Sequence, residues 1–191
     1  MITSFVLLIE CTNLRCFDLV ISTERNLLID KPTISPFNIG LRIPLEPFDL
    51  KESLRLNGRF EKLVGKSLNS EDVKRLFDLL QGQPYLMHEA IYAVTYKRFG
   101  SAKKLIEKAD TDASPFADHL RALSNRIMHR AEYNLANALR QIIAGDSLTD
   151  QYAIGRLKAA GLVRIERGTP IPANHLYARF FGKLFESGKM L

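Results

Sequence analysis

The order of apolar and polar positions divides the chain into three parts. Short apolar runs dominate residues 1–48, and the run at 17–21 is bounded by polar residues, which predicts a buried strand. Residues 49–130 place apolar side chains every three or four positions, as amphipathic helices do. Residues 131–191 change from helical spacing to alternation and turns. The pattern predicts an α/β portion followed by a mainly α portion.

Capping signals indicate where the helices of the middle part begin and end. Asp49 and Glu52 have the spacing of a capping box, and Gly58 is expected to end the helix that they start. Ser70 is expected to cap the second helix. Pro84 fits the first turn of a third helix, because the N–H group that proline lacks has no helical partner at that position.

The carboxyl-terminal part has the element order helix, helix, β-hairpin, helix. Thr149 is expected to cap the second of these helices. Residues 162–166 alternate as a strand, Arg167-Gly168 suits a hairpin turn, and residues 170–172 form the returning strand. This order is that of a winged helix-turn-helix, which this part of the chain is therefore predicted to adopt.

The composition is that of a globular protein with a basic surface. Hydrophobic residues make up 46% and charged residues 25%, and the formal net charge is +6. This charge favours acidic partners: nucleic acid, a nucleotide or an anionic surface. Arg156 and Lys158 lie on the predicted recognition helix, and Arg164 and Arg167 lie near the predicted wing, where each could contact a phosphate. For any single basic residue, a solvated position is the commoner situation.

Candidate catalytic and metal-binding chemistry is sparse. Cys11 and Cys16, with four scattered histidines, lack the spacing of a zinc site, and few cysteines suit the reducing cytoplasm. The apolar run at 5–9 is too short to span a membrane. "VGKS" at 64–67 lacks the glycine that a Walker A loop needs five residues earlier, where Phe60 stands. The sequence predicts no catalytic residue and no metal ligand.

Five segments occur in an order that resembles a known family. They are LVIST, SPFNIGLRIPLEPFDLKE, LLQGQPYLMHEAIY, DASPFADHLRAL and KAAGLVRIERGTPIPANHLYARFF. Together they resemble the AAA-like ATPase domain of multidomain bacterial proteins, notably cyanobacterial ones, which is similar to the STAND signalling ATPases and the origin-recognition ATPases. The resemblance covers about residues 17–186 and implies a P-loop AAA+ core, a helical lid and a winged helix.

The resemblance gives individual residues a role. The strand at 17–21 resembles the sensor-1 strand, and polar residues at the carboxyl end of such a strand are placed to meet a ligand. The Gly-Gln-Pro corner at 82–84 resembles the GxP element at the core–lid junction, which closes over the nucleotide in related signalling ATPases. By resemblance, the nucleotide-facing residues are Thr23, Arg25, Gly82, Pro84 and Tyr85.

The resemblance also implies domain limits. Residues 1–48 would be a partial ATPase core, 49–130 the helical lid and 131–191 the winged helix. Family members carry Walker A and Walker B motifs before the sensor-1 strand. The run ending at Glu10 has the form of a Walker B strand, but no Walker A sequence precedes it. The chain is therefore expected to be the carboxyl-terminal part of such an ATPase.

The expected function is that of a non-hydrolysing regulatory or protein-interaction module in a cytoplasmic signalling switch. The chain would need no cofactor of its own, although the complete family domain takes ATP and Mg²⁺. Its partner would be a protein or an upstream ATPase half, with weak non-specific contact to nucleic acid and none to membranes. The alternative function is that of a winged-helix DNA-binding protein, which the basic residues would serve.

Overall fold

The computed structural model describes residues 7–10, 17–20, 46–96, 99–128 and 134–187, which form mainly helices. Strand β1 (Leu7–Glu10) pairs antiparallel with β2 (Phe17–Val20), with Leu7 opposite Val20. The predicted strand at 17–21 is thus present. An open α/β core would give it parallel neighbours, whereas its partner within the described residues is antiparallel. Its role as a sensor-1 strand stays a prediction.

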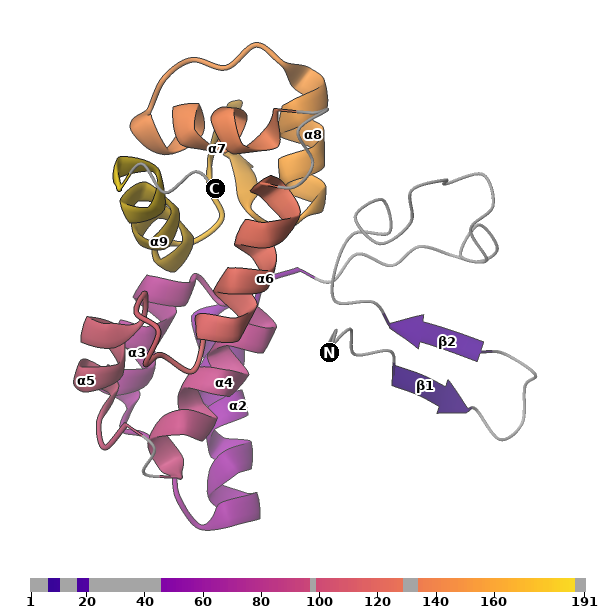
Figure 1. The fold of residues 1–191 in the computed structure, drawn as a ribbon. Helices are drawn as coiled ribbons and strands as arrows, with labels where there is room; N and C mark the ends of the chain where they lie inside the picture. Colours follow the sequence, from indigo (N-terminus) through magenta and orange to yellow (C-terminus); the bar gives the residue numbers. More distant parts are fainter. Residues whose placement is uncertain (1–6, 11–16, 21–45, 97–98, 129–133, 188–191) are drawn as a thin grey trace.

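The middle part forms a helical body, as its apolar spacing predicts. Helix α2 packs against α3 and α4, α3 packs against α5, and α6 leads towards the carboxyl-terminal elements (Figure 1). Side chains that are fully buried between these helices include Val73, Leu76, Leu80, Leu86 and Ile91. The bounds are α2 (Leu50–Val64), α3 (Ser70–Leu80), α4 (Pro84–Thr95), α5 (Ala102–Lys108) and α6 (Ala117–Met128).

Helix α2 begins as predicted and ends later than predicted. Asp49 and Glu52 form the reciprocal capping box, with the Glu52 amide 2.6 Å from Asp49 Oδ1. The expectation that Gly58 ends the helix is wrong, because Gly65 at φ 68° provides the left-handed cap instead. Beyond Gly58 the helix still buries Phe60, and such burial outweighs the cost of about 1 kcal/mol for a glycine inside a helix.

Two further capping residues differ from the prediction by one position. Asn69, and not Ser70, caps α3, because its side-chain oxygen accepts the Asp72 amide at 2.7 Å. Asp150, and not Thr149, caps α8, because its carboxylate accepts the Ala153 amide at 3.0 Å. Each pair of neighbours holds two residues that can cap a helix, so sequence alone does not choose between them.

The carboxyl-terminal elements follow the predicted order of helix, helix, hairpin and helix. Strands β3 and β4 pair antiparallel, and their turn places Arg167 at φ 50° and Gly168 at φ 83°, as tight hairpin turns require. Helix α7 packs against both α8 and α9. The bounds are α7 (Leu135–Ala144), α8 (Gln151–Ala159), β3 (Val163–Glu166), β4 (Thr169–Pro172) and α9 (His175–Glu186).

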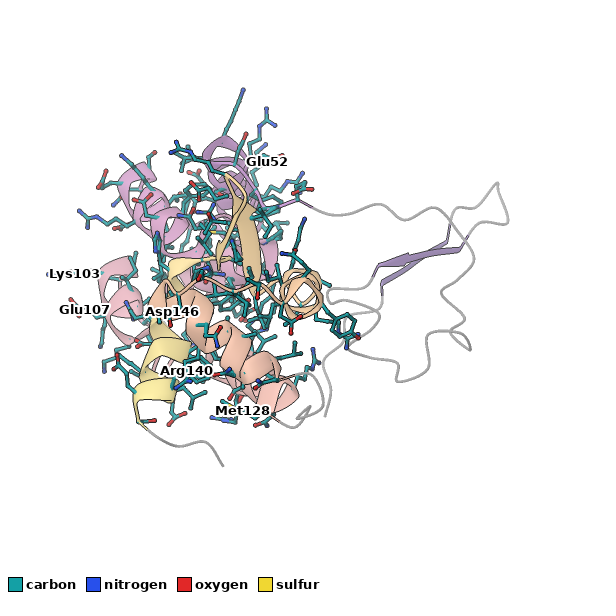
Figure 2. The ribbon with its side chains drawn as sticks, turned by 90° about the horizontal axis from the view of Figure 1, so that it is seen from above. Glu52, Lys103, Glu107, Met128, Arg140 and Asp146 are labelled. Atoms are coloured by element: carbon teal, nitrogen blue, oxygen red, sulfur yellow. The ribbon has the colours of Figure 1, made fainter. Side chains whose placement is uncertain are left out.

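Helix α9 joins the two groups of helices, because it contacts α7 on one side and α3 and α6 on the other. Viewed from above, Lys103 and Glu107 of α5 lie on the outside of the molecule (Figure 2). None of the helices that the structure describes is both long and apolar enough to cross a membrane.

Candidate functional site

The corner between α3 and α4 is formed by three consecutive residues with distinct roles. Gln81 ends α3 in the left-handed region at φ 50°, and Gly82 follows at φ 71°. Gln83 caps α4 by accepting the Leu86 amide at 2.6 Å, and Pro84 occupies the first turn. The predicted helix start at Pro84 is confirmed.

Gly82 lies directly against the backbone that precedes α2. The Phe48 amide donates a hydrogen bond of 2.8 Å to the Gly82 carbonyl oxygen. A Cβ atom on Gly82 would stand 1.9 Å from the Phe48 carbonyl oxygen. The chain's own packing therefore requires a glycine here, with no ligand involved. That Gly82, Pro84 and Tyr85 face a nucleotide stays a prediction.

Tyr85, the second residue of α4, belongs to a cluster of three rings from three helices. Its ring centroid lies 5.0 Å from that of His119 on α6. His119 Nε2 lies 2.9 Å from the hydroxyl oxygen of Tyr177 on α9. Because these residues come from α4, α6 and α9, the cluster connects the middle helices to the carboxyl-terminal elements.

Burial keeps this cluster uncharged at neutral pH. It lowers the pKa of His119 to about 4, and the positive charge of Arg126 acts in the same direction. Burial also raises the pKa of both tyrosines, with Glu89 adding to the effect at Tyr85. Neutral His119 carries one ring proton, so its Nε2 can pair with the Tyr177 hydroxyl without placing a charge in the interior.

A second polar cluster, with charges, joins the segment after α5 to α9. Asp110 is buried, and its two carboxylate oxygens lie 2.5 Å from Arg179 Nη2 and from Lys183 Nζ. Arg179 also donates a hydrogen bond of 2.8 Å to the Ile106 carbonyl oxygen. Burial tends to raise the pKa of Asp110, but the hydrogen bonds from Arg179 and Lys183 outweigh it, so the pKa is lowered.

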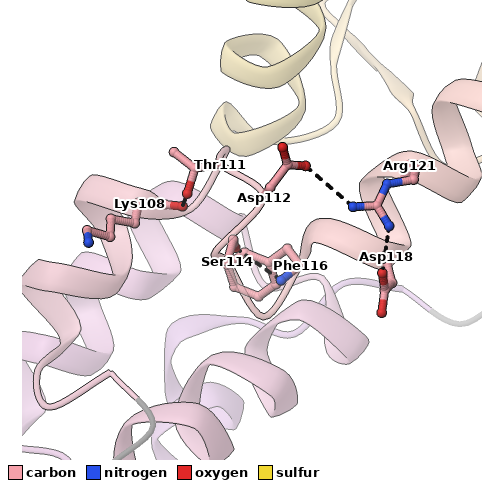
Figure 3. Close-up of polar contacts among 7 residues, drawn as sticks. All are labelled: Lys108, Thr111, Asp112, Ser114, Phe116, Asp118 and Arg121. Carbon is pink, nitrogen blue, oxygen red and sulfur yellow. Dashed lines mark hydrogen bonds and ion pairs between the residues drawn. The ribbon is translucent and has the colours of Figure 1, made fainter.

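Local hydrogen bonds fix the segment that presents Asp110. The Thr111 hydroxyl donates to the Lys108 carbonyl oxygen at 2.8 Å, and the Phe116 amide donates to Ser114 Oγ at 3.0 Å (Figure 3). The Asp110–Arg179 pair spans 69 residues of chain. No local sequence pattern indicates a contact between residues so far apart in the chain. The sequence therefore did not predict this cluster or the role of His119.

The predicted nucleic-acid-binding residues differ in how much charge they offer. Lys158 and Arg167 are exposed. Arg164 is also exposed but its guanidinium lies 3.0 Å from a carboxylate oxygen of Glu166. Arg156 is half-buried on α8. The structure brings α8 and β3 into contact, yet only Lys158 and Arg167 combine full exposure with the absence of a described ion pair.

Other predicted features lie partly outside the described residues. Thr23, Arg25, Cys11 and Cys16 are all outside them. Among the residues that the structure does describe, no group of three or more His, Cys, Asp or Glu side chains could hold a metal ion. Lys66 of "VGKS" is exposed in the loop that follows α2, so a helix stands where a Walker A loop would follow a strand.

The described residues are mainly helical and include two short antiparallel strand pairs. A family model described as the AAA-like domain matches residues 11–183. The chain therefore belongs to the AAA-like domain family. Neither the comparison with curated proteins nor that with solved structures gave a match.

Proposed function

We propose that this chain is a non-hydrolysing regulatory module of a cytoplasmic AAA-like switch and that it acts by engaging a protein partner. Residues 49–130 serve as the helical lid and 131–191 as the winged helix. In a STAND-type switch, the nucleotide state of the ATPase core sets the position of these two parts, which exposes or hides the partner surface. ATP and Mg²⁺ belong to the complete family domain.

The observation that carries the proposal is the polar connection between α9 and the middle helices. Asp110 forms ion pairs with Arg179 and Lys183, and His119 forms a hydrogen bond with Tyr177. Such contacts replace contacts with water, so their net free energies are modest: about 1 kcal/mol for the neutral His119–Tyr177 contact and about 1.5–3 kcal/mol for each hydrogen bond to the charged Asp110. They define one arrangement in detail and can still be released, which is what a two-state element needs.

The surroundings of "VGKS" support the non-hydrolysing part of the proposal. Gly65 caps α2 with its amide bonded to the Glu61 carbonyl oxygen. In a Walker A loop the corresponding backbone amide would face phosphate. Here the amide is used within the helix, and Lys66 extends into solvent with no phosphate-binding loop around it.

The charge distribution favours a protein partner over the DNA-binding alternative. Arg164 is paired with Glu166, and this ion pair weakens the attraction of Arg164 for a phosphate. The exposed positions of the predicted recognition helix are Gln151, Tyr152, Gly155 and Lys158. Gly155 has no side chain to read a base edge, and the other three include no arginine or asparagine, which is a small set for reading an operator.

Steady-state turnover of ATP with Mg²⁺ tests the non-hydrolysing assignment. The purified chain is expected to release no phosphate above the buffer rate. Lys66→Ala, and Lys62→Ala as a matched exposed control on α2, are expected to behave like the unmodified chain. Turnover that Lys66→Ala abolishes and Lys62→Ala preserves would contradict the proposal, because it would make "VGKS" a working phosphate-binding loop.

A further inference from the structure

One side of α4 exposes a row of rings that the ring cluster of Tyr85 does not use. His88, Tyr92 and Tyr96 follow one another at intervals of four residues, so they lie on one face of the helix. Their exposed fractions are 52%, 39% and 54%. Leu63, near the end of α2, is 82% exposed. Exposed apolar groups gathered in this way are typical of interaction surfaces.

Helix α2, which packs against α4, carries a row of positive charges. Arg55, Arg59 and Lys62 are exposed and spaced by four and three residues, so they share one face. Within the described ranges none of the three has an ion pair. Leu63 follows Arg59 by one helical turn, which places the exposed leucine beside the positive row.

Phe60 connects the two rows. It follows Arg59 on α2, and its ring centroid lies 5.3 Å from that of His88 on α4. His88 Nδ1 lies 3.5 Å from a carboxylate oxygen of Glu89, so one acidic residue lies beside the ring row. The surface called the α2–α4 face below combines apolar groups with positive charge and is formed by Arg55, Arg59, Lys62, Leu63, His88, Tyr92 and Tyr96.

The ring geometry decides which kind of acidic partner suits the α2–α4 face. The His88 and Tyr92 rings are nearly parallel, at 6° and 6.3 Å between centroids, and the Tyr92 and Tyr96 centroids are 4.5 Å apart. The Tyr92 and Tyr96 rings are tilted by 36°, and neither spacing leaves room for a nucleic-acid base to insert between two rings. Ring edges are positive and tyrosine hydroxyls donate hydrogen bonds. The exposed edges and hydroxyls of these rings therefore suit carboxylates.

We propose that the α2–α4 face is the docking surface for an acidic peptide segment that also carries apolar side chains. Carboxylates of the segment pair with Arg55, Arg59 and Lys62, and its apolar side chains cover Leu63 and the edges of Tyr92. This inference rests on the proposed function only in that a regulatory module needs a partner. Its test uses no ATP, so the docking experiment can fail while the ATP experiment succeeds, and the reverse.

Fluorescence anisotropy with the full chain tests the docking surface. The probe is a labelled amphipathic peptide of glutamate and leucine, and the comparison probes are its lysine–leucine counterpart and an oligo(dT) strand. The glutamate–leucine peptide is expected to bind, and more weakly as salt rises. Arg59→Glu and Leu63→Glu are each expected to raise its Kd roughly fivefold or more. Both side chains are exposed, so both variants are expected to fold.

The control is Lys103→Glu on α5, an equal change of charge on another surface, which is expected to leave the Kd unchanged. Thermal melting of each variant confirms that it is folded. Three outcomes would overturn the proposal: no binding of the acidic peptide, equal weakening by Lys103→Glu, or equal binding of the lysine–leucine peptide. Preferential binding of oligo(dT) that Arg59→Glu weakens would also overturn it and would assign the face to nucleic acid.

Discussion

Gly82 brings two backbone segments closer than any other residue type would allow. Its carbonyl oxygen accepts the Phe48 amide, and its missing Cβ leaves room for the Phe48 carbonyl oxygen. The glycine of the GxP-like corner therefore has a structural task, which is to hold the entry of α2 against the junction of α3 and α4. This structural role alone explains why a glycine stands at position 82, and it is compatible with a further contact to a nucleotide.

Gly82→Ala is expected to destabilise the chain by about 2 kcal/mol or more, because alanine at φ 71° is strained and its Cβ would overlap the Phe48 backbone. Gly65→Ala is the matched control. It has nearly the same angle, φ 68°, but nothing within 4 Å of the added Cβ, so only the angular strain of about 1 kcal/mol applies. Urea denaturation measures both, and equal losses would show that the Phe48 contact is unimportant.

At the scale of elements, α9 is held to the middle helices by His119 through Tyr177 and by Asp110 through Arg179 and Lys183. The aromatic contact depends on a neutral imidazole. His119 has a pKa of about 4 in the folded chain, against about 6.5 in an unfolded one. The folded state therefore resists protonation, and stability from this group is full above pH 6.5 and falls as the pH drops towards 4.

The free energy of unfolding is accordingly expected to drop by about 1–2 kcal/mol between pH 7.5 and pH 5 through His119. His119→Gln keeps a hydrogen-bonding group near Tyr177 and removes the titration, so its unfolding free energy is expected to change less across this range. Urea denaturation at several pH values checks this, and an unaltered profile for His119→Gln would contradict it.

Elements were predictable from the sequence where their signals are local. The capping box of α2, the proline start of α4 and the Arg-Gly hairpin turn are each specified by neighbouring residues, and all three are confirmed. The prediction that Gly58 ends α2 was wrong, because the burial of later residues of the helix outweighs the weak helix propensity of glycine. The clusters of Asp110 and His119 were not predictable, since each depends on packing between residues more than fifty positions apart.

At the scale of the whole molecule, the family membership and the distribution of positive charge both concern which partner the chain binds. The AAA-like match spans residues 11–183, and the formal net charge is +6. Within the described residues, the α2–α4 face adds exposed rings to arginines without ion pairs. In the face of α8 and the wing, Arg164 is paired and Arg156 is half-buried. The proposal that a partner binds on α2 and α4 rests on this difference.

The salt dependence of duplex binding distinguishes a protein-docking module from a DNA reader. Four phosphate contacts by the basic residues of α8 and the wing would give a slope near −4 on logarithmic axes. Among these four basic residues, only Lys158 and Arg167 are exposed and without an ion pair in the described structure. They are therefore expected to contribute a slope of about −2, which Lys158→Ala with Arg167→Ala should remove. Lys103→Glu on α5 provides a control for loss of charge elsewhere.

The measurement that tests the central claim most directly is a titration of the full chain against a pool of random-sequence DNA duplexes, with selection of bound sequences. A protein-interaction module is expected to select no sequence and to bind the pool with a Kd of roughly 10 µM or weaker near physiological salt. Recovery of one sequence bound at nanomolar Kd at about 150 mM salt, with binding lost in Lys158→Ala, would contradict the account and establish DNA recognition as the function.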